Sequence, residues 1–449
     1  MIGRYGGPDE PAHVLRAHAV AHGDLLGAPS AGLPPGYRTV TVPAGIGTGD
    51  PACYRHDPTV TSTCAAGTNT GAVTVATSAG TNPPLYYALV GLPPRLFGYS
   101  DDPLAYRLGA VTLAALVLAL AVVRLRLSGE RRLLGVALIT PSCWFLWGVV
   151  NPNSLEIALV ALAATGIGRR RPLVQRDLWW ISVPLAAAIA MRPIAVAWAL
   201  ALLVVVELIA HRDLTRRQRL VVWAPPAVAV VSVMVWNAWS GLVVDDMRTA
   251  EAGSLFDAGR ESLGGLPRSG AELVASLGWL EYWAPWLASV AWGGAVLVLA
   301  LGRPRPVRGA WAVLAVALIA VPVGFEMLLY DRVGLIWQGR YSLPVIAAAV
   351  VIALGSITRP LPRVAVHAMS GLAAVGTIAA FWSASRRYAT GTDGSWWFAG
   401  ADRTSRWLGP GTWVTVFSIL VAGATAVLLR RKAAVTMDRT MDRTTDQTM

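Results

Sequence analysis

Residues 178–210 read L-W-W-I-S-V-P-L-A-A-A-I-A-M-R-P-I-A-V-A-W-A-L-A-L-L-V-V-V-E-L-I-A, an apolar run with only Arg192 and Glu207 charged. One membrane crossing takes about 20 apolar residues, so this run is too long for a single crossing. Pro193 lacks a backbone N–H donor and clashes with the preceding helical turn. The sequence therefore predicts two transmembrane helices that meet at Met191-Arg192-Pro193.

The rest of the chain has the same character. Hydrophobic residues make up 55% of its 449 residues, charged residues only 14%, and the mean hydropathy is +0.51. Soluble domains need roughly 25% charged residues to cover their surface, so a soluble protein is excluded. We expect an all-α, polytopic transmembrane bundle of about eleven helices. The apolar segments lie near 106–123, 133–149, 154–168, 178–191, 193–210, 220–240, 284–302, 310–329, 341–357, 364–382 and 412–429.

The formal charge of +12 is carried almost entirely by arginine. Most arginines lie in short loops beside apolar segments, which sets membrane topology and does not indicate a nucleic-acid partner. Alternate connections are Arg-rich and are expected in the cytoplasm: 124–132, 169–176, 212–219, 303–308, 359–363 and the end at 430–432. The sequence thus predicts a multi-pass bacterial plasma-membrane protein with its N-terminus outside and its C-terminus in the cytoplasm.

Three regions follow from this threading. Residues 1–105 are expected to be an extracytoplasmic segment with short and interfacial helices, and 106–430 the bundle, with outer loops 241–283 and 383–411. Residues 431–449 are polar and repetitive, which predicts a disordered cytoplasmic tail. Since no apolar segment precedes the outer region, we expect that a helix upstream of Met1 has been lost. Cys53 and Cys64 both fall outside, where a disulfide is expected, with two free thiols as the alternative.

The first candidate site is G-P-D-E-P-A-H at residues 7–13. Pro11 suits the first turn of a helix that runs to about His22. On this helix His13 shares a face with Asp9 and with Glu10. The structural interpretation is that one carboxylate caps the helix. The functional interpretation is a general base, assisted by His13 or a divalent cation, with Arg16 nearby.

Two further motifs combine asparagine with aromatic or acidic residues. Asn82 and Tyr86 belong to T-N-P-P-L-Y-Y, which precedes a stretch too short to span and is expected to be an interfacial helix. Asn151, Asn153 and Glu156 belong to N-P-N-S-L-E, a turn between two helices. Interface aromatics and helix capping are the structural alternatives.

The last candidate site is W-Q-G-R-Y, with Gln338, Arg340 and Tyr341 at the outer entry to a helix. Arginine here runs against the positive-inside trend, and its planar fork matches phosphate. An aromatic belt, or a salt bridge from Arg340 to Asp331, is the alternative. Arg107 and Arg192 are expected on the same side.

Four motifs in order resemble the domain-of-unknown-function family 2142 over roughly residues 5 to 430. They are G-P-D-E-P-A-H-V-L-R-A, N-P-P-L-Y-Y, N-P-N-S-L-E and Q-G-R-Y-S-L-P. The family consists of bacterial membrane proteins and looks like the GT-C glycosyltransferases. In those enzymes an acidic residue of the first outer loop is the catalytic base, and Asp9 and Glu10 occupy that place.

The resemblance implies sugar transfer from a polyprenyl-phosphate donor to a glycan or lipid acceptor of the cell envelope. Asp9, with Glu10 second, would take the acceptor proton. Arg340, with Arg107 or Arg192, would stabilise the departing phosphate. The sequence identifies no definite cofactor, and a divalent cation stays open. A transporter or flippase of a lipid-linked saccharide is the main alternative, and a structural subunit of an envelope complex is another.

Overall fold

The computed structural model describes residues 3–30, 32–33, 36–67, 70–127, 129–167, 173–210, 213–241, 254–304, 309–401 and 409–445. Parts of the expected loops 169–176, 241–283, 303–308 and 383–411 lie outside these ranges, as does the end of the tail. The described chain is mainly helical. Its α-helices are α1 (Glu10–Ala21), α2 (Ala44–Gly47), α3 (Pro84–Phe97), α4 (Pro103–Leu125), α5 (Glu130–Ala137), α6 (Pro141–Trp147), α7 (Pro152–Ile167), α8 (Gln175–Met191), α9 (Ala195–Ala210), α10 (Arg216–Ser240), α11 (Leu255–Ala275), α12 (Trp286–Leu301), α13 (Ala310–Val333), α14 (Leu343–Ser356), α15 (Arg363–Ala389) and α16 (Pro410–Thr445).

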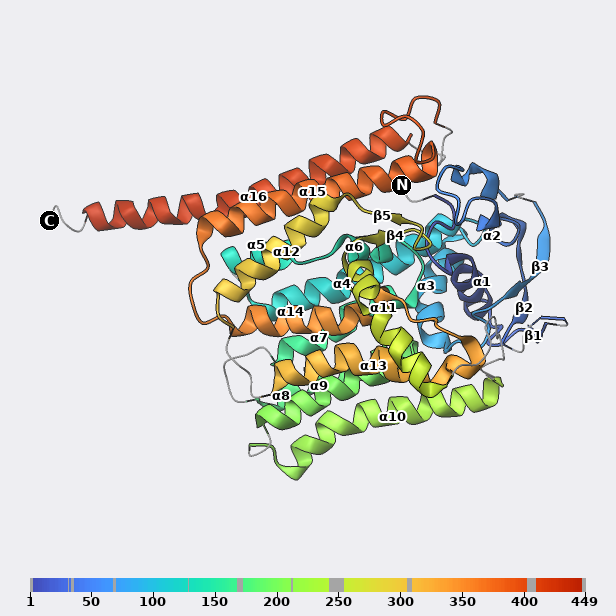
Figure 1. The fold of residues 1–449 in the computed structure, drawn as a ribbon, viewed down its shortest axis with the longest axis horizontal. Coiled ribbons are helices and arrows are strands. Elements are labelled where there is room, and N and C mark those ends of the chain that lie inside the picture. Colours follow the sequence, from blue (N-terminus) through green and yellow to red (C-terminus); the bar gives the residue numbers. More distant parts are fainter. Residues whose placement is uncertain are drawn as a thin grey trace.

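The long helices run roughly along one direction and form the bundle (Figure 1). Six described helical segments are long and apolar enough to cross a membrane, and the bent pair α6–α7 makes a seventh if it counts as one span. The six are Pro103–Leu125, Arg216–Ser240, Ala310–Tyr330, Gly339–Ser356, Arg363–Ala389 and Pro410–Leu428. Helices α9 and α12 are apolar but shorter. The predicted polytopic, all-α membrane fold is confirmed.

The expected segment 133–149 is wrong as a continuous helix. It is divided into α5 and α6, because Pro141 keeps Thr140 extended and the Thr140 hydroxyl accepts a hydrogen bond from the Cys143 N–H. Helix α6 then meets α7 at an angle of 118°. This bend carries the N-P-N-S-L-E motif to the end of the bundle. The other ten expected segments each coincide with a helix.

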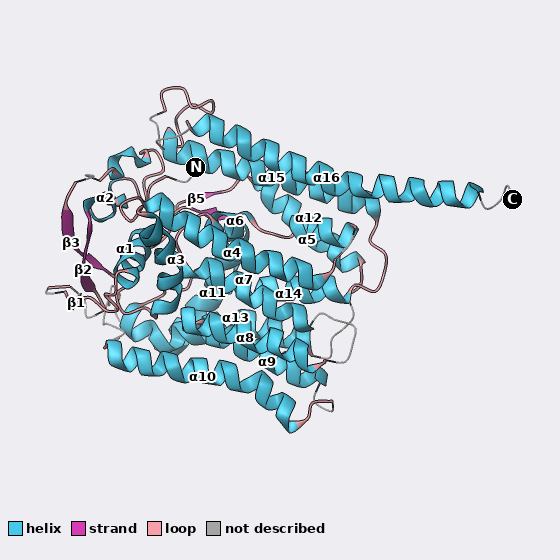
Figure 2. Ribbon diagram, turned by 180° about the vertical axis from the view of Figure 1, so that it is seen from behind, coloured by secondary structure: helices cyan, strands magenta, loops and turns pink. Residues whose placement is uncertain are grey.

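The N-terminal segment covers one end of the bundle (Figures 1 and 2). Besides α1 and α3 it contains an antiparallel sheet that the sequence analysis did not predict, of order β1-β2-β3. Val40 of β2 pairs with Val75 of β3. A disulfide joins Cys53 to Cys64, whose Cα atoms are 6.2 Å apart. The strands are β1 (Ala28–Pro29), β2 (Arg38–Pro43) and β3 (Ala72–Thr77), with β4 (Ser276–Leu277) and β5 (Tyr282–Trp283) as a separate pair.

Contacts sort the connections between helices into two ends. Those expected outside touch the N-terminal segment, through Asn151 Nδ2 to Pro8 O (3.1 Å), Trp279 Nε1 to Tyr5 O (3.0 Å), Arg340 Nη2 to Asp9 Oδ2 (2.8 Å) and Arg387 Nη2 to Tyr54 O (2.8 Å). Connections expected in the cytoplasm touch one another, through Arg131 Nη2 to Ile357 O (3.2 Å) and Arg363 Nε to Glu130 Oε1 (3.4 Å). The predicted alternation of the loops therefore agrees with the fold.

Helix α16 differs from its expected extent. Its backbone continues to Thr445, across the segment from residue 431 that was expected to lack regular structure. In Figure 1 this end of the chain projects beyond the bundle, away from the N-terminal segment. The boundary predicted at residue 430 therefore does not coincide with the end of the helix.

Candidate functional site

Helix α1 presents three of the predicted site residues. Asp9, His13 and Arg16 are separated by four and three positions and so share one face. Asp9 is the N-cap residue, but it has a left-handed backbone (φ 61°) and its side chain makes no capping hydrogen bond. The capping interpretation of Asp9 is therefore wrong. A Cβ atom at Gly7 would lie 2.7 Å from Val149 Cβ, so glycine lets this turn pack closely against the α6–α7 junction.

Glu10, the second candidate base, is only 1% exposed and faces away from this group. Its carboxylate accepts two hydrogen bonds of 2.6 Å from Arg107, and further bonds from the N–H groups of Gly7 and Val150. Arg107 also donates to the carbonyl of Gly3. These hydrogen bonds anchor α1 to α4 and to the α6–α7 junction. Glu10 and Arg107 are thus a structural ion pair, and their assigned roles in catalysis and phosphate binding are corrected accordingly.

Asp9 instead faces Arg340. The carboxylate Oδ2 accepts a hydrogen bond of 2.8 Å from Arg340 Nη2, although 331 residues separate them in the chain. The side chain of Asp9 is 51% exposed, whereas that of Arg340 is only 6% exposed. Arg340 also donates to the hydroxyl of Tyr341 at 3.3 Å. Its Nε and Nη1 atoms are buried and have no hydrogen-bond partner in the part of the chain that the structure describes.

A second arginine borders the same group. The guanidinium of Arg192 lies 4.7 Å from the centre of the Tyr341 ring and forms an ion pair of 2.6 Å with Glu156. Asn153 Nδ2 donates to the same carboxylate at 3.2 Å. The remaining oxygens, Glu156 Oε1 and Asn153 Oδ1, are buried without a partner among the described residues. Asn151, by contrast, serves the turn, because its Nδ2 donates to Pro8 and its Oδ1 accepts from the Asn153 N–H.

A chain of hydrogen bonds extends from His13 along α1. His13 Nδ1 lies 2.9 Å from the hydroxyl of Tyr87, which accepts from Asn82 Nδ2 at 2.8 Å. Arg16 donates to the backbone carbonyl of Asn82 at 3.0 Å. Of the two tyrosines in the N-P-P-L-Y-Y motif, Tyr87 is therefore the one that takes part in these hydrogen bonds. Tyr86, the predicted residue, is buried and packs its ring edge-on against Tyr87 at 5.3 Å.

Two buried carboxylates hold the segment that carries Arg340. Glu326 on α13 accepts hydrogen bonds from the N–H groups of Ile336 and Trp337, and Glu272 on α11 accepts one of 2.8 Å from Gly339. Sequence reasoning missed both carboxylates as part of the site. Gln338 lines a polar cavity of about 300 Å³ between α11 and α13, together with Glu261, Arg268, Ser269, Glu272, Glu326 and Trp337.

The surrounding charges set the protonation of the group. Partial burial opposes ionisation of Asp9, but the positive charge of Arg340 and its hydrogen bond, together with the charge of Arg192, hold the pKa of Asp9 below its usual value. Burial lowers the pKa of His13 to about 4, despite the attraction of Asp9. At neutral pH the structure therefore combines an ionised Asp9 with a neutral His13.

The described residues do not form a metal centre. No group of three or more His, Cys, Asp and Glu side chains among them is placed to hold a metal ion. Near Asp9, Glu10 and Glu156 are each bound to an arginine. This donor set does not fit a divalent cation.

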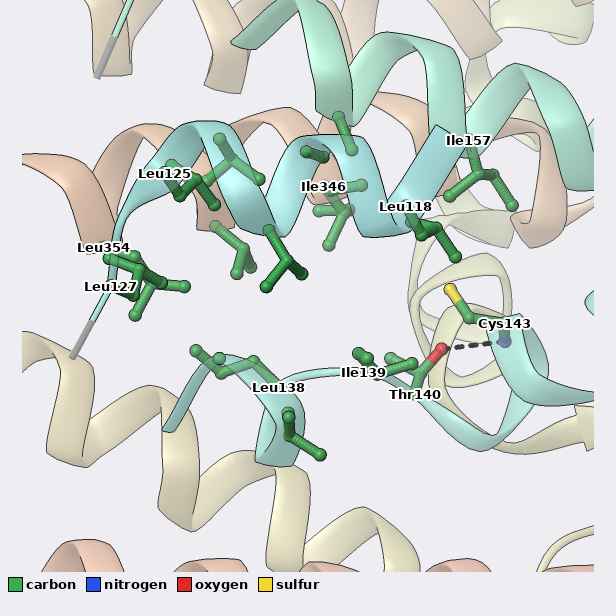
Figure 3. Close-up of a pocket in the computed structure, with 18 of the residues that line it drawn as sticks. Leu118, Leu125, Leu127, Leu138, Ile139, Thr140, Cys143, Ile157, Ile346 and Leu354 are labelled. Atoms are coloured by element: carbon green, nitrogen blue, oxygen red, sulfur yellow. Dashed lines mark hydrogen bonds between the residues drawn. The ribbon is translucent and has the colours of Figure 1, made fainter. Parts of the chain in front are cut away.

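An apolar cavity lies inside the bundle, beyond Arg340. Its volume is about 250 Å³, and α4, α5, α6, α7, α14 and α16 contribute to its wall (Figure 3). On α14 the lining runs from Leu343, three residues after Arg340, to Leu354. The lining residues labelled in Figure 3 are Leu118, Leu125, Leu127, Leu138, Ile139, Thr140, Cys143, Ile157, Ile346 and Leu354.

Comparison with known proteins gives one family and one solved structure. The sequence profile described as "Predicted membrane protein (DUF2142)" matches residues 3–349. The crystal structure of ArnT from Cupriavidus metallidurans in the apo state is similar, with a TM-score of 0.48 and 13% identity. This likeness covers 96% of the present chain and 66% of the ArnT chain. No curated protein matches the sequence.

Proposed function

The chain belongs to the DUF2142 family of predicted membrane proteins, and from its site we propose that it is a membrane glycosyltransferase. It would move a sugar from a polyprenyl-phosphate donor to a glycan or lipid acceptor, on the outer face of a bacterial plasma membrane. The observation that carries this proposal is the contact of 2.8 Å between the half-exposed Asp9 and the buried Arg340. This contact supports the proposal because a carboxylate that could act as a base lies beside a cation that could bind phosphate.

The reaction assigns one task to each of these groups. The acceptor hydroxyl oxygen forms a bond to the anomeric carbon, while the bond from that carbon to the phosphate oxygen breaks. The proton of the hydroxyl passes to the Asp9 carboxylate, and the electron pair of the broken bond stays on the polyprenyl phosphate. The donors Nε and Nη1 of Arg340 are free to bind that phosphate.

Binding of the donor also activates Asp9. In the free protein the charge of Arg340 makes Asp9 a weak base. A phosphate bound to Arg340 compensates this charge, so the pKa of Asp9 rises and proton transfer becomes more favourable. General base catalysis of this kind contributes typically about 10²–10⁴ in rate. His13 stays neutral in this scheme, so it does not compete with Asp9 for the proton.

Sugar hydroxyls find complementary groups nearby. Glu156 Oε1 and Asn153 Oδ1 are buried acceptors without a donor in the described part of the chain. A hydroxyl that donates to them would replace the hydrogen bonds they lack, which are costly to leave unmade. Arg192 is ion-paired with Glu156 and covers the face of Tyr341. We assign these residues to recognition of the transferred sugar.

The apolar cavity suits the lipid chain of the donor. Along α14 it extends from Leu343 to Leu354, a separation of eleven positions or about 16 Å. This is about half the hydrocarbon thickness of a bilayer. Because the lining begins at Leu343, three residues after Arg340, a phosphate bound at Arg340 would let the first isoprene units enter the cavity. Their burial would be favourable at about 25 cal/mol per Å².

The experiment is a transfer assay on the purified full-length protein with polyprenyl-phosphate sugars, guided by comparing envelope glycans with and without the gene. Asp9→Asn and Arg340→Ala should abolish transfer while leaving expression intact. Matched controls are Asp393→Asn and Arg359→Ala, which change exposed residues outside the site. Normal transfer by either site variant refutes its role. Movement of intact lipid-linked saccharide without transfer would favour the transporter.

A further inference from the structure

Arg16 is buried completely, yet no carboxylate among the residues that the structure describes forms an ion pair with it. It is 0% exposed, and its one hydrogen bond goes to the carbonyl of Asn82. The Nε and Nη1 atoms have no partner among the described residues. Four other buried arginines are paired: Arg107 with Glu10, Arg124 with Asp177, Arg340 with Asp9 and Arg387 with Glu281. Arg38, which is less deeply buried at 9% exposed, donates to the carbonyl of Ser240.

An unpaired buried charge is expensive, costing several times more than an unpaired neutral group. Two rings compensate only in part, because Tyr87 and Trp236 each have their centre 5.8 Å from the Arg16 guanidinium. Burial accordingly lowers the pKa of Arg16 to about 10, with small opposing effects of Tyr87 and of the exposed Asp24. Such a group is stable in a protein when a ligand supplies the missing anion.

Arg16 and Arg340 form two positions and not one phosphate cradle. Asp9 and Arg16 are seven residues apart on α1, which corresponds to about 10 Å along the helix. His13 lies between Asp9 and Arg16 along α1. Tyr87 lies beside this part of the helix, with its hydroxyl 2.9 Å from His13 Nδ1 and its ring centre 5.8 Å from the Arg16 guanidinium.

We propose that Arg16 binds a second anionic group of the substrate, a carboxylate or phosphate carried by the transferred sugar or by the saccharide acceptor. The substrate class is therefore an acidic saccharide, with Tyr87 and His13 between its acidic group and the phosphate at Arg340. This inference rests on the proposed function and makes it more specific. Trp236, fixed by its hydrogen bond of 2.7 Å to the Thr81 carbonyl, forms the wall behind the guanidinium.

The test measures binding of acidic monosaccharides to the purified full-length protein, by the shift of its thermal midpoint at constant ionic strength. Glucuronate and glucose 6-phosphate are the probes, since they separate a carboxylate from a phosphate, and glucose is the neutral reference. The wild type should show a saturable shift with at least one acidic probe and none with glucose. Arg16→Gln should weaken that binding by at least about 30-fold, the usual effect of truncating a buried ion pair.

Two further variants keep the test decisive. Arg16→Lys, which retains the charge but not the fork, should bind the same probe more weakly than the wild type and better than Arg16→Gln. Arg340→Ala should still bind it. Arg16→Gln should unfold at the same temperature as the wild type or higher, because it removes an unpaired charge; a lower midpoint would show that Arg16 is structural.

Equal probe binding by the wild type and Arg16→Gln overturns the inference, and so does a wild type that binds neither acidic probe better than glucose. These results are separate from the transfer assay, because probe binding needs no turnover. Transfer that depends on Asp9, without Arg16-dependent binding, contradicts this inference alone. Probe binding without any transfer contradicts the proposed function alone.

Discussion

Loss of charge at the two acidic residues at the start of α1 should destabilise the protein to very different extents. Glu10→Gln keeps the shape of the side chain but places an amide among the N–H donors of Arg107, Gly7 and Val150. Removing one partner of a buried ion pair costs roughly 3–5 kcal/mol. Asp9→Asn changes a side chain that is half exposed, where ion pairs contribute about 0–1 kcal/mol.

These energies translate into measurable shifts of the thermal midpoint. The unfolding entropy of globular proteins, about 2.1 cal/mol/K per residue, gives roughly 0.9 kcal/mol/K for 449 residues. Glu10→Gln should therefore lower the midpoint by about 3–5 °C, and Asp9→Asn by no more than about 1 °C. The assay is thermal unfolding in detergent, followed by retention of the monodisperse peak in size-exclusion chromatography. Arg107→Met should match Glu10→Gln. An Asp9→Asn variant as unstable as Glu10→Gln would refute the division into a structural and a chemical carboxylate.

Three further outcomes are expected. The kcat/KM of the wild type, which reports the free enzyme, should not decline on the acid side until pH falls through the lowered pKa of Asp9. The residual kcat/KM of Arg340→Gln should decline at higher pH, because the pKa of Asp9 rises without the guanidinium; unchanged acid limbs would contradict their coupling. Reduction of the Cys53–Cys64 disulfide, whose cysteines are 11 residues apart, should lower the free energy of unfolding by roughly 3 kcal/mol and the thermal midpoint by about 3 °C. An unaltered midpoint after complete thiol labelling would show that the bridge does not stabilise the segment. Ala347→Trp should fill the apolar cavity and raise the KM for long-chain donors more than for short-chain ones. An equal rise for both donors would show that the cavity does not bind the lipid chain.

The periodic and compositional parts of the sequence predicted the fold well. Long apolar runs located ten of the eleven expected segments, and Pro11 located the start of α1. The break in 133–149 was missed because its hydropathy is continuous, although Thr140-Pro141 carries a stop signal. Strands β2 and β3 were missed because short alternations of Val and Thr are a weak strand signal in a Gly- and Thr-rich segment.

The site was predictable in its residue types but not in its pairings. Asp9 and Arg340 stood out because each is an ionisable residue beside a helix end on the expected outer side. That Glu10 would bind Arg107 depends on which side of a tight turn each carboxylate occupies, which local spacing does not determine. Glu272 and Glu326 were missed because they accept hydrogen bonds from backbone N–H groups 67 and 10 residues away, which no motif spacing indicates.

The central claim is that Asp9 accepts the proton of the acceptor hydroxyl while Arg340 binds the departing phosphate. The most direct measurement is the single-turnover rate of sugar release from a polyprenyl-phosphate donor by purified Asp9→Asn, with Asp9→Glu and Asp393→Asn alongside. The account predicts a loss of at least about 10² for Asp9→Asn, partial activity for Asp9→Glu and wild-type rates for the control. A rate for Asp9→Asn within about threefold of the wild type would contradict it, since general base catalysis contributes far more than that.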